Sequence, residues 1–174
     1  MDNTTRRNLI KKIGQASVIG TIGSSALLNS KKVSAASKSK IRIGAPLPLT
    51  GMFSGDGEEF RRGITMAIED INAAGGVCGH EVEAVIDDAQ DSFVEQVRAS
   101  FERLVRKEKV DAIVCGYLIG SPAADMDLVA EAGIPYLNQH AQVKVSEQIE
   151  ANPNKYSMIF QTCPPGTYYG YGLA

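Results

Sequence analysis

The dipeptide Ser121-Pro122 is the part of this 174-residue sequence whose residue types best suit ligand binding. A serine followed by a proline is typical of a helix start, because the serine side chain caps the helix and proline fits its first position. The first N–H groups of that helix and the serine hydroxyl then face one point, which suits a carboxylate or another electronegative group. We therefore predict that Ser121 contacts a ligand; the alternative is that the dipeptide only starts a helix.

Three ring side chains are further candidates. Phe53 and Tyr117 are expected to pack on an apolar part of a ligand, with a place in the core as the alternative for both. His140 has three interpretations, which the sequence leaves open: a ligand donor, a pH-sensitive group, or a polar residue at the edge of the fold.

A catalytic centre is not expected. Asp87 and Asp88 are adjacent on a predicted strand, so their side chains point to opposite faces and do not converge for acid–base chemistry. The sequence has no GxSxG elbow, no HExxH pair and no P-loop, and its two histidines are His80 and His140. We therefore expect a protein that is not an enzyme and that needs no cofactor.

The cysteines do not indicate a metal site either. Cys78, Cys115 and Cys163 are widely spaced and form no CxxC pair, so no metal bound by thiolates is expected. Cys115 ends an apolar run that begins at Ala112, which predicts a small buried core residue.

These residues are positioned by an alternation of predicted strands and helices. Apolar runs predict strands over 41–47, 82–88, 112–115, 134–138 and 158–162. Apolar residues share one helical face in two predicted helices, in Phe60, Ile64, Ala67, Ile68 and Ile71 and again in Phe93, Val97, Phe101, Leu104 and Val105. Gly75 and Gly76 end the first helix, Ser92 caps the second, and a third is predicted over 125–132.

This alternation predicts an α/β fold with a doubly wound parallel sheet. In such sheets, ligands bind outside the carboxyl ends of the strands. That rule points to four loops, which cover residues 48–57, 87–92, 116–123 and 138–143.

The charge balance differs between the start of the sequence and the rest. Formal charge is −2 overall, but six of the 18 basic residues lie before Ala36, against the single acid Asp2. The remainder is therefore mildly acidic and has no basic stripe, which argues against nucleic acid as a partner.

The first 35 residues are typical of an export signal. Arg6 and Arg7, followed by an apolar pair and a lysine, match a twin-arginine motif. A weakly apolar segment over 13–28 and a small-residue cleavage pattern at Ala35 and Ala36 follow in the order of a signal peptide. We expect export by the twin-arginine translocase, to the periplasmic or outer side of the cytoplasmic membrane. The alternative is a basic amphipathic helix that stays attached as a membrane anchor.

Residues 41–92 resemble the start of type I periplasmic binding proteins of the leucine/isoleucine/valine class. The shared features are a first strand, the segment PLTG, a helix that ends in DINAAGG and a strand that ends in paired acids. The likeness continues through Gly116–Ser121 and Gly133–Tyr136, and it covers about 41–170. The resemblance implies that the fold is the N-terminal lobe of a two-lobed receptor.

The resemblance also implies site residues. In that family, the loop after the third strand holds the α-carboxylate of an amino acid, which implies contacts from Gly120 and Ser121. Ala141 and Gln142 match a second contact loop, and Tyr168 lies where chain from the second lobe approaches the ligand. The amide-rich segment around these residues departs from the small-residue run of many relatives, so we leave the ligand open between an amino acid and a related small amide.

The sequence is thus divided into three regions: the signal peptide over 1–35 and, as the resemblance implies, a ligand-binding lobe over 36–162 and a hinge crossing over 163–174 that begins a second lobe. Family members are more than twice this length, so we expect a truncated second lobe and only half of a ligand site. The implied function is an extracytoplasmic receptor that delivers its ligand to the permease subunits of an ABC transporter. The alternatives are a ligand-sensing module of a receptor or regulator and, with no nucleophile to support it, an amide hydrolase.

Overall fold

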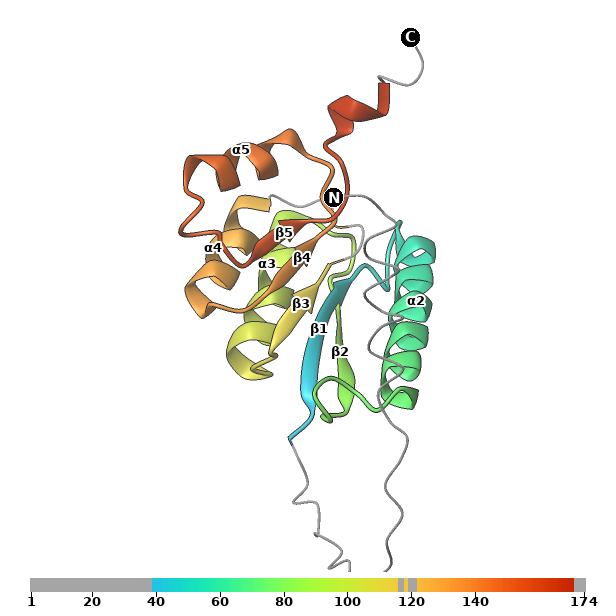
Figure 1. The fold of residues 1–174 in the computed structure, drawn as a ribbon. Helices are drawn as coiled ribbons and strands as arrows, with labels where there is room; N and C mark the ends of the chain where they lie inside the picture. Colours follow the sequence, from blue (N-terminus) through green and yellow to red (C-terminus); the bar gives the residue numbers. More distant parts are fainter. Residues whose placement is uncertain (1–38, 116–117, 119–121, 171–174) are drawn as a thin grey trace, which may run out of the picture. The chain divides into compact units, whose positions relative to one another are not determined.

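The computed structural model describes residues 39–115, 118 and 122–170. They contain a parallel sheet of five strands in the order β2-β1-β3-β4-β5 (Figure 1). The strands are β1 (Ile41–Leu47), β2 (Val82–Asp88), β3 (Ala112–Val114), β4 (Tyr136–Asn138) and β5 (Ile159–Gln161). Because β1 lies between β2 and β3, the winding of the chain reverses there, which confirms the predicted doubly wound α/β fold.

A helix follows each of the first four strands. They are α2 (Ser54–Ala73), α3 (Val94–Glu102), α4 (Pro122–Ala132) and α5 (Val143–Ala151), with a π-helical turn over Arg103–Lys107 and a 3-10 helix over Gly166–Gly170. In Figure 1, α2 covers one face of the sheet, while α3, α4 and α5 lie on the other. Among the described residues, no helix is long and apolar enough to cross a membrane.

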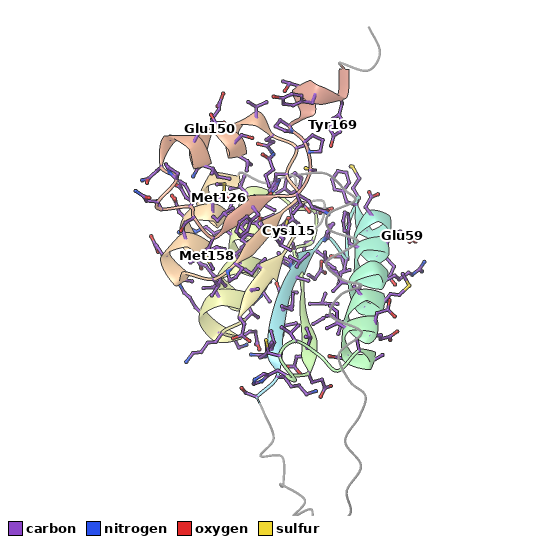
Figure 2. All side chains as sticks on the ribbon, in the orientation of Figure 1. Glu59, Cys115, Met126, Glu150, Met158 and Tyr169 are labelled. Carbon is purple, nitrogen blue, oxygen red and sulfur yellow. The ribbon has the colours of Figure 1, made fainter. Side chains whose placement is uncertain are left out.

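The core lies on the face of the sheet that α3 and α4 cover. Phe101 of α3 and Tyr136 of β4 are both fully buried and make an edge-to-face contact, with ring centroids 5.4 Å apart. Cys115 and Met126 lie in the interior beside them (Figure 2). The prediction of a buried Cys115 is therefore confirmed, and its burial raises the pKa of the thiol to about 12.

The opposite face of the sheet is less covered. Side chains alternate along a strand, so Leu137 and Phe160 point away from the core and remain 42% and 50% exposed. On helix α2, Phe60 and Ile64 are only half-buried, and with Val114 they line an apolar groove of about 370 Å³. The predicted apolar face of this helix is thus partly open.

The cap predicted for the second helix is wrong. The residue before α3 is Phe93, not Ser92, and the Gln96 side chain accepts a hydrogen bond from the Phe93 N–H at 3.2 Å. Ser92 has a left-handed backbone (φ 62°) that turns its side chain inward, where its hydroxyl is buried. Phe93 is consequently 65% exposed and is not part of the buried face that includes Val97.

Other element bounds differ at their ends. Strand β4 begins at Tyr136 rather than at Ile134, because Pro135 has no N–H to donate to a neighbouring strand. Helix α4 begins at Pro122, where the Ser-Pro dipeptide predicts a helix start, and so extends three residues before the range predicted over 125–132. Helix α5 was not predicted at all; Val145 is the buried residue within it.

Candidate ligand-binding site

The edge of the sheet at the carboxyl ends of the strands carries the start of every α-helix that follows a strand. Helices α2, α3, α4 and α5 follow β1, β2, β3 and β4 respectively, so their N-termini lie at that one edge. Each N-terminus carries a partial positive charge of roughly half an elementary unit. The edge therefore favours a negatively charged group.

The loop after β1 is fixed by a carboxylate from the neighbouring strand. Asp88, the last residue of β2, accepts hydrogen bonds at Oδ1 from the backbone N–H groups of Leu49 (3.0 Å), Thr50 (3.2 Å) and Gln90 (2.8 Å). Its Oδ2 accepts a bond from the Thr50 hydroxyl at 2.8 Å. One side chain thus satisfies three backbone donors in the turns after β1 and β2.

A second acid extends this arrangement. Asp91 Oδ1 accepts a hydrogen bond from the Met52 N–H at 2.9 Å. Gly51 lies between these groups with φ 86°, and a side chain there would come within 1.8 Å of the same Asp91 oxygen. Gly57 is similarly constrained, because a Cβ would lie 2.1 Å from the Pro48 carbonyl oxygen. The β1 loop therefore requires glycine at position 51, and the first turn of α2 requires it at position 57, to approach their neighbours this closely.

The paired acids Asp87 and Asp88 diverge, as predicted. Asp87 forms an ion pair with Arg103 at 2.5 Å on one side, while Asp88 holds the β1 loop on the other. Partial burial acts to raise the pKa of Asp88, but the hydrogen bonds from Thr50, Gln90 and Leu49 outweigh it, so the pKa is lowered. Asp88 is therefore a stable anion that organises backbone rather than an acid–base catalyst.

The loop after β4 has a buried and an exposed side. Asn138 and His140 point into the core, and the Asn138 side-chain oxygen accepts a hydrogen bond from the His140 N–H at 2.7 Å. His140 is 4% exposed, its Nε2 has no hydrogen-bond partner among the described residues, and burial lowers the pKa of the ring. The ring is therefore neutral and lies beneath the loop rather than on its outer surface.

The structure places four of the residues predicted to contact a ligand. Phe53 directly precedes α2 and is half-buried; Ala141 is half-buried in the β4 loop; Gln142 is exposed and precedes α5. These three lie at the carboxyl edge of the sheet. Tyr168 is 62% exposed on the 3-10 helix.

Three other predicted contacts, Tyr117, Gly120 and Ser121, lie outside the described residues, as does the signal segment over 1–35. The helix start that the Ser-Pro dipeptide predicts is found, because α4 begins at Pro122.

Two side chains that hold the loops were not recognised from the sequence as site residues. Asp88 lies in the predicted loop over 87–92, but its residue type suggests only an acid–base role, and Gln161, the last residue of β5, lies in none of the four predicted loops. Gln161 Nε2 donates to the His140 carbonyl at 2.6 Å, and its Oε1 accepts a bond from Ser146 Oγ at 2.6 Å. A useful signal was their position, since each is a polar residue at the carboxyl end of a strand.

A second groove lies away from these loops, between α3 and α4. It measures about 330 Å³ and is lined mainly by charged residues, among them Arg98, Arg106 and Asp125. Burial raises the pKa of Asp125 to about 7. Within the part of the chain that the structure describes, no group of three or more histidine, cysteine or acidic side chains could hold a metal ion.

Comparison with known proteins agrees with this architecture. A family model described as periplasmic binding protein matches residues 40–170. The Leu/Ile/Val-binding protein homolog 8 of Brucella abortus is 30% identical over 135 residues, which are 78% of this chain and 32% of that protein.

Two solved structures share the fold. One, from Silicibacter pomeroyi and assigned to a branched-chain amino acid ABC transporter, is 37% identical with a TM-score of 0.75, over 78% of this chain and 34% of that one. Another is a solute-binding protein of an ABC transporter from R. palustris, in complex with 4-hydroxybenzoate. It is 26% identical with a TM-score of 0.54, over 71% of this chain and 32% of that one.

The chain spans about a third of the length of each of these relatives. Because the family model matches most of its length, the chain belongs to the periplasmic binding protein family, and it is similar to members of that family named for leucine, isoleucine and valine.

Proposed function

We propose that this chain is the ligand-binding lobe of an extracytoplasmic receptor that delivers an amino acid, or a related small amide, to an ABC transporter. The observation that carries the proposal is the carboxyl edge of the sheet, where the helix N-termini meet two loops held by side-chain hydrogen bonds. Fixed N–H groups at positive helix ends are suited to a carboxylate.

The relatives support a ligand that carries a carboxylate. One is named for leucine, isoleucine and valine, and another was solved with 4-hydroxybenzoate. These compounds differ in their apolar part but share a carboxylate next to a hydrophobic group. The negative carboxylate matches the positive helix N-termini at the carboxyl edge of the sheet. We place amino acids before aromatic acids as the expected ligand because the relatives of higher identity are named for amino acids.

Each predicted site residue has a role in this proposal. Gly120 and Ser121 bind the carboxylate at the N-terminus of α4, and Ala141 with Gln142 forms the second polar contact. Phe53 and Tyr117 pack against the apolar part. Tyr168 approaches from the crossing toward the second lobe, whose closure over the ligand would present the complex to the permease subunits.

We also propose that residues 1–35 direct export through the twin-arginine translocase and that the receptor acts outside the cytoplasmic membrane. Arg6 and Arg7, the weakly apolar segment and the small residues at Ala35 and Ala36 support this proposal.

The experiment is a chemical-shift titration of the isotopically labelled chain. One lobe offers about half of a ligand site, so we expect a dissociation constant on the order of 1 mM or weaker, about 4 kcal/mol of binding free energy. Leucine, valine, glutamine and 4-hydroxybenzoate are added separately at millimolar concentration, with leucinamide as the matched compound that lacks the carboxylate. We expect shifts in residues 49–53 and 139–142 with leucine but not with leucinamide. Equal responses to both compounds, or shifts confined to other surfaces, would reject a carboxylate site at this edge.

A further inference from the structure

The end of β5 and the segment after it bind four consecutive carbonyl groups, which run from the last residue of β4 into the loop that follows it. The Asn138 carbonyl accepts from the Thr162 N–H at 2.8 Å and from its Oγ1 at 3.1 Å, and the Gln139 carbonyl accepts from Cys163 Sγ at 2.9 Å. The His140 carbonyl accepts from Gln161 Nε2 at 2.6 Å, and the Ala141 carbonyl accepts from the Gly166 N–H at 2.5 Å. The four carbonyls of residues 138–141 are thus all held from one side. The approach is close, since a Cβ on Gly166 would lie 3.3 Å from the Ala141 oxygen.

Gln161 has a specific part in this arrangement because its amide is bound at both ends. Ser146 Oγ donates to Gln161 Oε1 at 2.6 Å, which leaves Nε2 to donate to the His140 carbonyl at 2.6 Å. The same Nε2 lies 3.5 Å from the Gln142 carbonyl. A primary amide supplies one acceptor and two donors, whereas an ionised carboxylate only accepts and an alkyl group does neither. The side chain therefore connects β5, the β4 loop and α5.

The bound carbonyls determine what the loop presents to a ligand. Among the described residues, the backbone N–H groups of Ala141 and Gln142 donate no hydrogen bond, and they lie directly before α5. The Gly166 N–H holds the Ala141 carbonyl, and the Val145 N–H of α5 bonds to the Gln142 carbonyl at 3.1 Å. These bonds keep the two donors at the N-terminus of the helix, where a negative group is favoured.

We propose that Gln161 is a positioning residue, which fixes the β4 loop so that the N–H groups of Ala141 and Gln142 meet the polar group of the ligand. This inference rests on the proposed function, because it assumes that the loop contacts the ligand. Gln161 itself acts through the loop and does not touch the ligand.

The test compares two substitutions at Gln161 with a matched change elsewhere. Gln161→Glu keeps the size and the acceptor for Ser146 but cannot donate to the His140 carbonyl at neutral pH. Gln161→Leu removes both functions. Gln148→Leu is the control: the Gln148 amide donates to Tyr156 Oη at 2.8 Å, in the same region but with no bond to the loop. Amide chemical shifts and hydrogen exchange of residues 139–142 are measured without ligand, and leucine is then titrated at pH 7.

Both Gln161 variants should shift the amide signals of residues 139–142 and speed hydrogen exchange of the His140 N–H, which is bonded to Asn138 Oδ1. Both should also weaken leucine binding roughly tenfold, which equals about 1.4 kcal/mol. Gln148→Leu should do neither, even if its melting temperature falls. A folded Gln161→Glu protein with wild-type loop amides or wild-type leucine affinity overturns the positioning role. If the wild-type chain itself shows no response to leucine, the proposed function fails, and the measurements without ligand alone decide whether Gln161 fixes the loop.

Discussion

Replacing Asp88 should destabilise the protein far more than replacing its neighbour Asp87. Asp88→Ala removes the acceptor for three backbone N–H groups and one hydroxyl. Thr50 and Gln90 are exposed and can bond to water instead. Leu49 is half-buried, and its N–H loses its charged partner and keeps only the Leu47 carbonyl at 3.0 Å. Losing one such bond costs about 1.5–3 kcal/mol. For a protein of this size, that is a fall in melting temperature of roughly 5–10 °C.

Asp87→Ala is the matched control. It removes an acid of the same size from the adjacent position, but the interaction lost is a partly exposed ion pair with Arg103 at the surface. Such pairs contribute about 0–1 kcal/mol. Thermal and urea unfolding of the three proteins at pH 7 would measure the difference. An equal loss for the two variants would refute the role that we assign to Asp88 as organiser of the β1 loop.

The dependence on pH gives a second check of the same role. Hydrogen bonds lower the pKa of Asp88 in the folded protein below its value of about 3.9 in an unfolded chain. Its ionised form therefore stabilises the fold above pH 4, and this contribution is lost as pH falls through the folded pKa. The stability advantage of wild type over Asp88→Asn should be constant from pH 5 to 8 and should shrink in acid below pH 4. An advantage that persists undiminished in strong acid would contradict this assignment.

Three further outcomes are expected. Ser121→Ala should weaken leucine binding roughly ten- to a hundredfold, from the loss of a hydrogen bond to a charged group; a fall in melting temperature with unchanged affinity would make Ser121 only a helix cap. Replacing Arg6 and Arg7 with lysine should retain precursor in the cytoplasm, as followed by cell fractionation, and unchanged export would reject the twin-arginine assignment. Because burial raises the pKa of Asp125 to about 7, wild-type stability should fall by up to about 4 kcal/mol as pH rises from 4 to 7, and Asp125→Asn should remove that fall in urea titrations.

The architecture could be predicted from the sequence because its longest elements carry strong local patterns. Strands β1 and β2 have the predicted bounds, since each is an apolar or alternating run of seven residues with turn residues after it. Helix α5 escaped prediction because it is short and mostly polar, with Val145 as its buried residue. Its position depends on contacts with β5 and α4 that no local pattern records.

The site was predicted less completely. The predicted loops around Phe53 and Ala141 do lie at one edge of the sheet, because they follow the carboxyl ends of the parallel strands β1 and β4. It could not show which side chains hold those loops. Strand alternation predicted that Asp88 points away from Asp87, but its bonds to Leu49 and Thr50 depend on the pairing of β1 with β2, some 40 residues apart in sequence.

Asp88 and Gln161 occupy equivalent places in the sheet, which leads to a last prediction. Each is the final residue of an edge strand, and each holds the loop that follows the adjacent strand, β1 for Asp88 and β4 for Gln161. An edge strand has one neighbour, so its terminal side chain has one such loop within reach.

Strands are about 4.8 Å apart, so the two edges of a five-stranded sheet are separated by roughly 19 Å. Effects of substitutions at that separation usually add within about 0.5 kcal/mol. The double variant Asp88→Ala/Gln161→Leu should therefore lose the sum of the two single losses in unfolding free energy. A difference from that sum of more than about 1 kcal/mol would show that the two loops are coupled through the sheet and are not held independently.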